Sequence, residues 1–137
     1  MSLFSVFDIS GTALQAESVR LNTTSSNLAN ANSISSSQGG TYRARHPVFA
    51  PIFNEFGEQE SNVGVKVLGI VESQKPLRRE HNPNHPMADE EGFVFLPNVN
   101  VVEEMANMIS ASRAYQTNVE VMNSAKQMLM RTLTLGQ

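Results

Sequence analysis

The chain of 137 residues contains no cysteine and no tryptophan, and aromatic residues make up only 7% of it. The lack of cysteine excludes disulfide bonds, cysteine nucleophiles and thiolate metal ligands. No apolar run approaches the roughly 20 residues that a membrane-spanning helix requires. These absences leave a chain of ordinary domain size whose function depends neither on thiol chemistry nor on a helical membrane span.

The N-terminal segment also lacks the features of a cleaved secretory signal. Its sequence, MSLFSVFDISGTALQ, has neither a basic n-region nor a continuous apolar core. We therefore expect the protein either to stay in the cytoplasm or to leave it by a route that does not cleave the N-terminus.

Charge is low and mixed in sign. The formal net charge is −3, and the only local basic clusters are the pairs Arg43/Arg45 and Arg78/Arg79. A nucleic-acid-binding surface needs a broader basic patch with interleaved aromatic residues, so we expect no nucleic acid as a partner. The chain also lacks the G-x-S-x-G elbow and the glycine-rich phosphate loops. We expect no catalytic residues, no cofactor and no small-molecule substrate.

One segment has the residue types of a metal site. His81 and His85 lie in HNPNHP with Asp89 close behind, and imidazole with carboxylate is a common set of zinc donors. However, Pro83 and Pro86 prevent the helix that would bring the two histidines onto one face. The composition favours a surface turn, and a metal-dependent enzyme is kept as the weaker alternative.

The longest regular pattern covers residues 98–137, and no proline or glycine interrupts it before Gly136. Large side chains recur every seven residues, which predicts one face of an α-helix. These positions are Val101, Met108, Tyr115, Met122 and Leu129. Asn100 is the expected N-cap, and Gly136 can end the helix. At 1.5 Å per residue the helix is about 50 Å long, so other elements must cover its apolar face.

Residues 1–31 predict a second helix with a heptad-like seam. Its leading positions are Phe7, Leu14, Leu21 and Leu28. Residues 22–27, with the sequence NTTSSN, have poor helix propensity, so this helix depends on packing against a partner. The Ser/Gly-rich tract 32–41 that follows has the composition of a loop.

Residues 42–97 contain all six prolines of the chain, so no long helix fits there. The alternation in Val63–Val71 is the best strand signal in the chain. Val48–Phe53 is a short apolar run and Phe93–Leu96 is a further short strand. Two polar stretches interrupt this region: residues 54–62 suit a turn, and residues 79–92 form a polar excursion.

These patterns predict a mainly α protein with a small β insert. The long N- and C-terminal helices are paired in a coiled-coil-like arrangement, and short antiparallel strands lie between them. Residues 1–36 hold the N-terminal helix and its Ser-rich segment. Residues 37–97 form the linker and the small β module, and residues 98–137 form the C-terminal helix.

The two helical stripes carry the strongest functional signal. They are long relative to the chain, and their seams are rich in Ala, Ser, Thr, Asn and Met rather than in Leu, Ile and Phe. Small residues let helices approach closely on several sides, and methionine adapts to different neighbours. This composition favours packing into a polymer. A soluble, monomeric helical hairpin that binds a partner is the alternative.

Specific residues also carry a resemblance to a known family. Residues 26–30, SNLAN, resemble the signature near the N-terminus of flagellar rod and hook proteins, and residues 98–137 resemble the C-terminal segment of that family. The segments YRARHPVFAP (42–51) and NPNHPMADEEGFVFLPNVN (82–100), with the short total length, are similar to the proximal-rod members in particular. The resemblance covers essentially the whole chain.

The resemblance implies a structural subunit of the bacterial flagellar basal body. It would assemble in the periplasm-spanning proximal rod, which transmits torque, and its paired terminal helices would line the export channel. Its neighbours would be further copies of itself, the rod proteins FlgB, FlgF and FlgG, the rod-to-ring adaptor FliE and the MS ring. Export through the flagellar type III apparatus would leave the N-terminus uncleaved.

We expect helix packing in the assembly to rest on ten residues. They are Leu14, Leu21, Asn27, Leu28, Asn30, Met108, Tyr115, Val119, Met122 and Leu129. Burial of each large apolar side chain contributes about 1.5–3 kcal/mol. Asn27 and Asn30 are expected to hydrogen-bond across the helix interface and so fix its register. Because the stripes lack sufficient cover within one chain, the termini of the free chain are expected to be disordered and to fold on incorporation.

Overall fold

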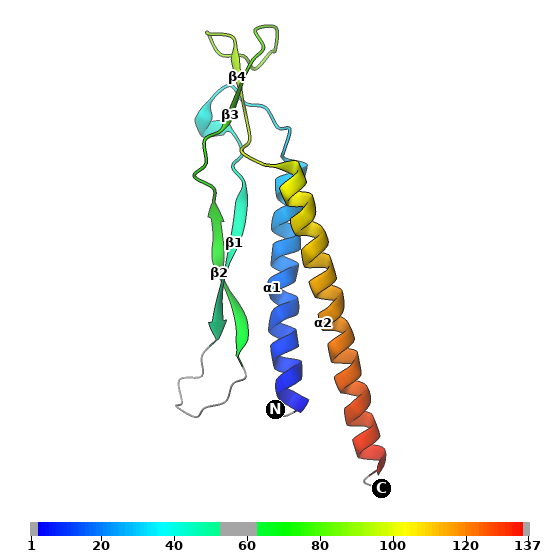
Figure 1. The fold of residues 1–137 in the computed structure, drawn as a ribbon. Helices are drawn as coiled ribbons and strands as arrows, with labels where there is room; N and C mark the ends of the chain where they lie inside the picture. The colour runs from blue at the N-terminus through cyan, green and yellow to red at the C-terminus, as the bar shows by residue number, and fades with distance from the viewer. Residues whose placement is uncertain (1–2, 53–62, 136–137) are drawn as a thin grey trace.

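The computed structural model describes residues 3–52 and 63–135 (Figure 1). Two long helices, α1 (Leu3–Ala29) and α2 (Val101–Leu135), dominate it. A short 3-10 turn and four strands lie between them in the described part of the sequence. Their bounds are Gln38–Gly40 for the turn, Arg45–Ile52 for β1, Gly64–Glu72 for β2, Arg78–His81 for β3 and Phe93–Leu96 for β4. The predicted fold class, mainly α with a small β insert between terminal helices, is confirmed.

The molecule is long and narrow, with α1 as its central element (Figure 1). Helices α1 and α2 run antiparallel and side by side. The β1–β2 hairpin packs along α1 on the side away from α2, and both of its strands contact α1. The β3–β4 hairpin stands at the end where α1 stops and α2 starts. α1 is therefore covered on two sides, whereas α2 packs mainly on α1 alone.

Small side chains allow the close packing of α1. Ser10, Ala16, Thr23 and Thr24 are all buried, with exposed fractions of 4–6%. The Thr23 hydroxyl donates a hydrogen bond to the Val19 carbonyl at 2.8 Å within the same helix, so burying it leaves no polar group unpaired. The low helix propensity of this stretch is thus offset by tertiary packing, as the sequence predicts.

Helix α2 begins as the sequence predicts. The Asn100 side-chain oxygen accepts hydrogen bonds from the backbone amides of Val102 at 3.1 Å and Glu103 at 3.4 Å, which makes Asn100 the N-cap. The expected end at Gly136 lies outside the described residues. At 35 residues α2 spans about 52 Å, and its C-terminal end projects beyond the start of α1 (Figure 1). In the described part of the chain, neither helix is apolar enough over a sufficient length to cross a membrane.

The β1–β2 hairpin has an irregular antiparallel register. Arg45 pairs with Glu72 and Ile52 with Gly64, with a shift between Val48 and Phe49. The strand predicted from the alternation of residues 63–71 is therefore confirmed. The expected turn at 54–62 and the end of the apolar run at residue 53 lie outside the described residues.

A hydroxyl of α1 fastens the start of β2. Thr12 Oγ1 accepts a hydrogen bond from the Val65 amide at 3.2 Å and donates one to the Ile9 carbonyl at 2.8 Å. Gly64 lies beside this hydroxyl, and a Cβ at that position would approach it to 2.9 Å. The approach of β2 to the helix is thus close enough to favour glycine.

The β3–β4 hairpin corrects the prediction for residues 79–92. Part of that polar segment is strand β3, which pairs with the predicted strand β4 from Arg78↔Leu96 to His81↔Phe93. No hydrophobic alternation marks β3, because all four of its side chains are exposed. Instead Arg79 stacks over the Phe93 ring at 4.0 Å and pairs with Glu91 at 2.9 Å. The described strands therefore form two separate two-stranded sheets.

The buried core of the described chain is small. One cluster joins Ala31, Ala44 and Val99, with Tyr42 packed against it. Val94 in β4 is 1% exposed. Large apolar side chains are mostly half-buried or exposed, so packing of small residues and buried polar contacts position the elements.

Gly92 closes the β3–β4 hairpin with a φ of +79°, and a Cβ there would lie 3.0 Å from Pro83 Cβ. We expect Gly92→Ala to destabilise this hairpin by about 1–2 kcal/mol, because a left-handed backbone disfavours a side chain. Hydrogen–deuterium exchange at the Asn82 amide, which bonds the Gly92 carbonyl at 2.9 Å, should accelerate. Gly69→Ala is the control, since no atom lies within 4 Å of its Cβ position. Equal exchange of the Asn82 amide in both variants would contradict a requirement for glycine at position 92.

Candidate functional site

The seam between α1 and α2 is lined by small residues. On α2, Ala111 and Ala125 are 0% and 1% exposed, and on α1, Ser10 is 4% exposed. Ala111 and Ala125 are separated by two heptads, so they lie on one face of α2. Small residues let the two helix backbones approach closely, and much of the remaining surface of α2 is left uncovered.

Asn27, the second residue of the SNLAN segment, is fully buried where α1, α2 and β1 meet. Its side-chain oxygen accepts hydrogen bonds from the Arg45 amide and the Tyr42 hydroxyl, both at 2.9 Å. Its side-chain nitrogen donates to the Arg45 carbonyl at 2.8 Å and to Glu104 Oε2 at 3.1 Å. All four hydrogen-bonding positions of the amide are therefore used. We call these four residues the Asn27 junction.

The prediction that Asn27 bonds across the helix pair is confirmed by its contact with Glu104. The same prediction for Asn30 is wrong, because its side chain donates to the Ser26 carbonyl of its own helix at 2.8 Å. The physical reason is position: Asn30 follows the last residue of α1, and its side-chain amide joins its own backbone amide, 3.2 Å away, on the same Ser26 carbonyl.

Sequence reasoning missed two members of the Asn27 junction, Tyr42 and Glu104. The Tyr42 hydroxyl also lies 3.2 Å from Ser26 Oγ, and its ring lies 5.5 Å from the Arg45 guanidinium. Glu104 is only 3% exposed although it is charged. In the sequence Glu104 looks like an ordinary acidic residue in the first turn of a helix, so only its burial distinguishes it from Glu103.

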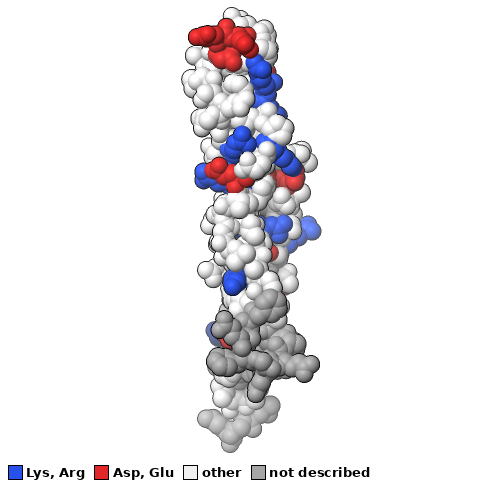
Figure 2. Space-filling view, turned by 90° about the vertical axis from the view of Figure 1, so that its left-hand side faces the viewer, with Lys and Arg blue, Asp and Glu red and all other residues white. Residues whose placement is uncertain are grey.

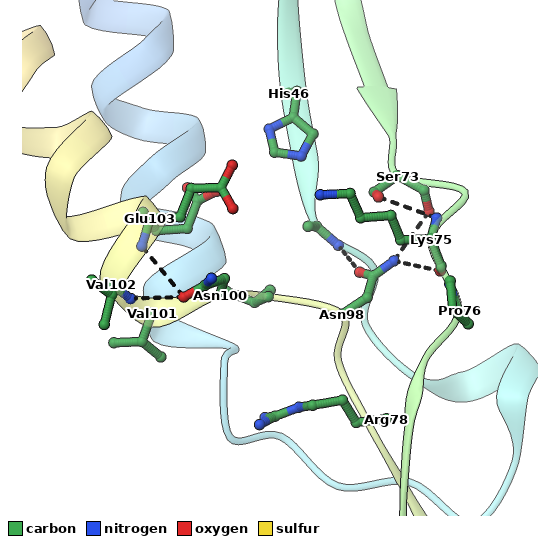
Figure 3. A pocket seen from close by; sticks show the side chains of 13 residues that line it. His46, Ser73, Lys75, Pro76, Arg78, Asn98, Asn100, Val101, Val102 and Glu103 are labelled. Carbon is green, nitrogen blue, oxygen red and sulfur yellow. Dashed lines mark hydrogen bonds between the residues drawn. The ribbon is translucent and has the colours of Figure 1, made fainter.

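A second asparagine ties the start of α2 to the β hairpins (Figure 3). The Asn98 side-chain oxygen accepts a hydrogen bond from the Ala44 amide at 2.8 Å, and its nitrogen donates to the carbonyls of Lys75 at 2.8 Å and Ser73 at 3.3 Å. Asn98 thus links the residue before β1, the segment after β2 and the segment that leads into α2.

A hollow of about 600 Å³ adjoins Asn98 and the first turn of α2 (Figure 3). Val101 and Val102 line its α2 side together with Glu103, while Lys75 and Arg78 line the opposite side. The charges of the lining are therefore mixed in sign. The composition specifies no particular small ligand.

The side chains of the weaker, metal-dependent alternative make contacts within the β3–β4 hairpin and its connecting turn. His81 packs edge-on against Phe93 with ring centroids 4.9 Å apart. His85 Nδ1 accepts a hydrogen bond from the Met87 amide at 3.1 Å, and Asp89 Oδ1 accepts from Glu91 and Phe93 amides at 3.0 and 2.8 Å. Across the described residues no group of three His, Asp or Glu side chains could hold a metal ion.

The ten residues predicted for the assembly interface fall into three classes of exposure. Asn27 is buried, and Tyr115 is 37% exposed. The other eight are half-buried: Leu14, Leu21, Leu28, Asn30, Met108, Val119, Met122 and Leu129. Half-burial means that the chain itself covers part of each side chain and leaves the rest free.

The most exposed apolar side chains of α2 were not among these ten. Val102 is 77% exposed, Met105 53% and Ile109 54%, and their spacing puts them on one face of the helix. Further along α2, Met130 and Leu133 are 58% and 68% exposed. The heptad positions lie on another side of α2, and two of them, Val101 and Tyr115, are themselves 40% and 37% exposed, so counting heptads does not find this second surface.

Charged side chains are distributed unevenly along the molecule. On the face in Figure 2, acidic and basic groups gather toward the end that carries the β3–β4 hairpin. Three ion pairs join described residues: Arg20–Glu17, Arg45–Glu72 and Arg79–Glu91. The Arg45 and Arg79 pairs are well exposed, so each contributes little to stability.

An elongated helix pair with exposed apolar faces is the architecture of a subunit that packs into a larger structural assembly. Two family models agree with this class. The model described as "Flagella basal body rod protein" matches residues 7–33, and "Flagellar basal body rod FlgEFG protein C-terminal" matches residues 90–135. The first match contains Asn27 and the second contains Glu104.

Individual relatives define the family more narrowly. The flagellar basal-body rod protein FlgC of Salmonella typhimurium is 48% identical over 137 residues, and that of Escherichia coli O157:H7 is 49% identical; both alignments cover all of each chain. FlgC of Borreliella burgdorferi is 38% identical over 151 residues, covering all of this chain and 99% of the relative. The chain belongs to the FlgC family of flagellar basal-body rod proteins. It is a structural rod subunit and not an enzyme.

We expect Asn27→Leu to prevent incorporation into the rod, since it removes four hydrogen bonds at a buried position, and each group left unpaired costs about 1–3 kcal/mol. The measurement is the amount of the chain in purified basal bodies, together with swimming in soft agar. Asn22→Leu, on an exposed position of the same helix, is the control and should behave like wild type. Normal swimming of the Asn27→Leu variant would show that assembly into the rod does not require the Asn27 junction.

Proposed function

We propose that this subunit builds the proximal part of the rod by packing its helix pair against neighbouring subunits, and that the packed helices transmit torque and line the export channel. The observation that carries the proposal is the uncovered apolar surface of α2. Val102, Met105 and Ile109 are more than half exposed on one face, while the small residues of the opposite face pack on α1. A monomer gains nothing from such a surface, whereas a polymer buries it.

The half-buried interface residues support the same proposal. Leu21 on α1 and Met122 on α2 are each covered only in part by their own chain. Burying the remainder against a neighbour contributes up to about 1.5–3 kcal/mol for a whole side chain. Many such partial contacts, repeated along helices of 27 and 35 residues, give a rigid contact suited to carrying load.

We propose further copies of this chain, FlgB, FlgF and FlgG as the neighbours along the rod, with FliE and the MS ring at the membrane end. Export through the flagellar type III apparatus is the corresponding route, and the N-terminal sequence, which lacks a Sec-type signal, suits it. The small and methionine-rich surfaces of the helices support neighbours that are related but not identical, because methionine adapts its shape to each.

Charge placed on the exposed face of α2 tests this proposal without disturbing the fold of the subunit. We expect Val102→Asp combined with Ile109→Asp to abolish swimming and to deplete the chain from basal bodies, since an interface would have to bury two carboxylates. Ser110→Asp, at an exposed position of the same helix, is the matched control. Swimming at wild-type rates by the double variant would show that this face is not an assembly surface.

The free chain provides an independent test. We expect circular dichroism of dilute purified protein to report far less helix than the 27 and 35 residues of α1 and α2, because much of the apolar surface of the helices is covered only in the assembly. Sedimentation should report a monomer under the same conditions. A fully helical monomer would instead favour the soluble helical-hairpin binding module.

A further inference from the structure

The small-residue seam by itself does not define how far α2 is displaced along α1. Ala111 and Ala125 of α2 stand two heptads apart, with Asn118 midway between them on the same face. A shift of α2 by one heptad in either direction would move one alanine into the place of Asn118 and Asn118 into the place of the other alanine. Polar residues that pair at one position only are the usual way in which a repetitive helix seam specifies its register.

Two polar contacts join the helices near the end where α2 begins. Asn27 Nδ2 donates to Glu104 Oε2 at 3.1 Å, and Arg20 donates to Asn107 Oδ1 at 3.4 Å. A shift by one heptad puts Ala111 or Pro97 opposite Asn27 in place of Glu104. The buried Glu104 carboxylate then loses the Asn27 amide, and burying a charged group without a partner is unfavourable. Native register is thus the arrangement that satisfies these side chains.

The register decides how far α2 projects. Asn27 lies two residues before the end of α1, and Glu104 three residues after the start of α2, so the helices are flush at this end. The difference between 35 and 27 residues, about 12 Å of helix, therefore appears at the other end. Figure 1 shows that end of α2 extending past α1. Met128, Met130 and Leu133 are 52%, 58% and 68% exposed there.

We propose that Glu104 and Asn107, through Asn27 and Arg20, are the positioning residues that set the register of α2 on α1 and so the length of the projecting C-terminal end. The use of that end rests on the proposed function, since in the rod it is the part of α2 that a neighbouring subunit meets. Burying the Glu104 carboxylate lowers the stability of the subunit somewhat, and its consequence is a single defined axial position of α2 on α1.

Cysteine pairs can measure the register, because the chain has no cysteine of its own. Counting along the antiparallel helices from the two polar contacts puts Ser10 level with Asn118. Ser10→Cys with Asn118→Cys therefore reports the native register. Ser10→Cys with Ala111→Cys or with Ala125→Cys reports a shift by one heptad in either direction. Disulfide formation is read on non-reducing gels of basal bodies from cells whose only copy of the chain is the variant.

With native Glu104 and Asn107, we expect a disulfide only in the Ser10/Asn118 pair. In the Glu104→Ala/Asn107→Ala background its yield should fall by a factor of about five to thirty relative to the shifted pairs. Glu104→Gln keeps an acceptor oxygen for the Asn27 amide, so a chain with this substitution should again form the disulfide only in the Ser10/Asn118 pair. Glu103→Ala, a neighbouring exposed glutamate, should leave it unchanged. An unchanged native pattern in the double variant overturns the proposal.

Asn98 is the competing anchor, since it also ties down the start of α2. A register shift in Asn98→Ala together with none in Glu104→Ala/Asn107→Ala assigns the register to Asn98 and overturns the proposal. If the double variant does not enter basal bodies, recovery of the chain is the readout. Recovery with Glu104→Gln but not with Glu104→Ala supports the proposal, and equal loss overturns it.

A separate variant distinguishes failure of the proposed function from failure of the register proposal. Met130→Asp combined with Leu133→Asp alters the projecting end without touching Glu104 or Asn107. If this variant swims normally and keeps the native disulfide, the projecting end has no role in assembly, while the assignment of the register stands. Loss of swimming with the native disulfide retained supports both.

Discussion

One buried amide holds the separate parts of this elongated subunit together. The Asn27 side chain hydrogen-bonds to both the amide and the carbonyl of Arg45 in β1. It also accepts a hydrogen bond from the Tyr42 hydroxyl and donates one to the Glu104 carboxylate. Because the apolar core of the described chain is small, few other contacts join all three elements. A buried polar group is unfavourable unless all its partners are present, so the junction forms only when α1, α2 and β1 take their native positions.

The seam between the helices is made of small residues, and this choice has a structural consequence. Small residues at positions such as Ala111 and Ala125 bring the helices close together but provide little apolar burial of their own. Larger apolar residues are left half-buried or exposed on α2. The subunit thus keeps for its neighbours in the rod the surface that a compact domain would use for its own core.

The fold class followed from sequence patterns because they are long and local. The uninterrupted heptad-spaced helix at the C-terminus, its Asn100 cap and the alternating strand of residues 63–71 are each decided by side chains close in sequence. Strand β3 was missed because its exposed Arg79 and Glu80 show no alternation, and its pairing with β4 is decided by partners more than ten residues away. The exposed face at Val102 and Ile109 was missed for the same reason: burial depends on which face α1 covers.

The sequence alone determined that two long helices flank a proline-rich β segment, and the SNLAN segment with the C-terminal run identified the rod and hook family. Those conclusions need only local spacing and motif residues. The tertiary structure alone decided that Asn27 reaches Glu104 while Asn30 turns back to its own helix, that Tyr42 closes the junction, and that α2 turns its larger apolar side chains outward. Side chains distant in sequence compete for the same buried space and hydrogen bonds, and only the folded chain resolves that competition.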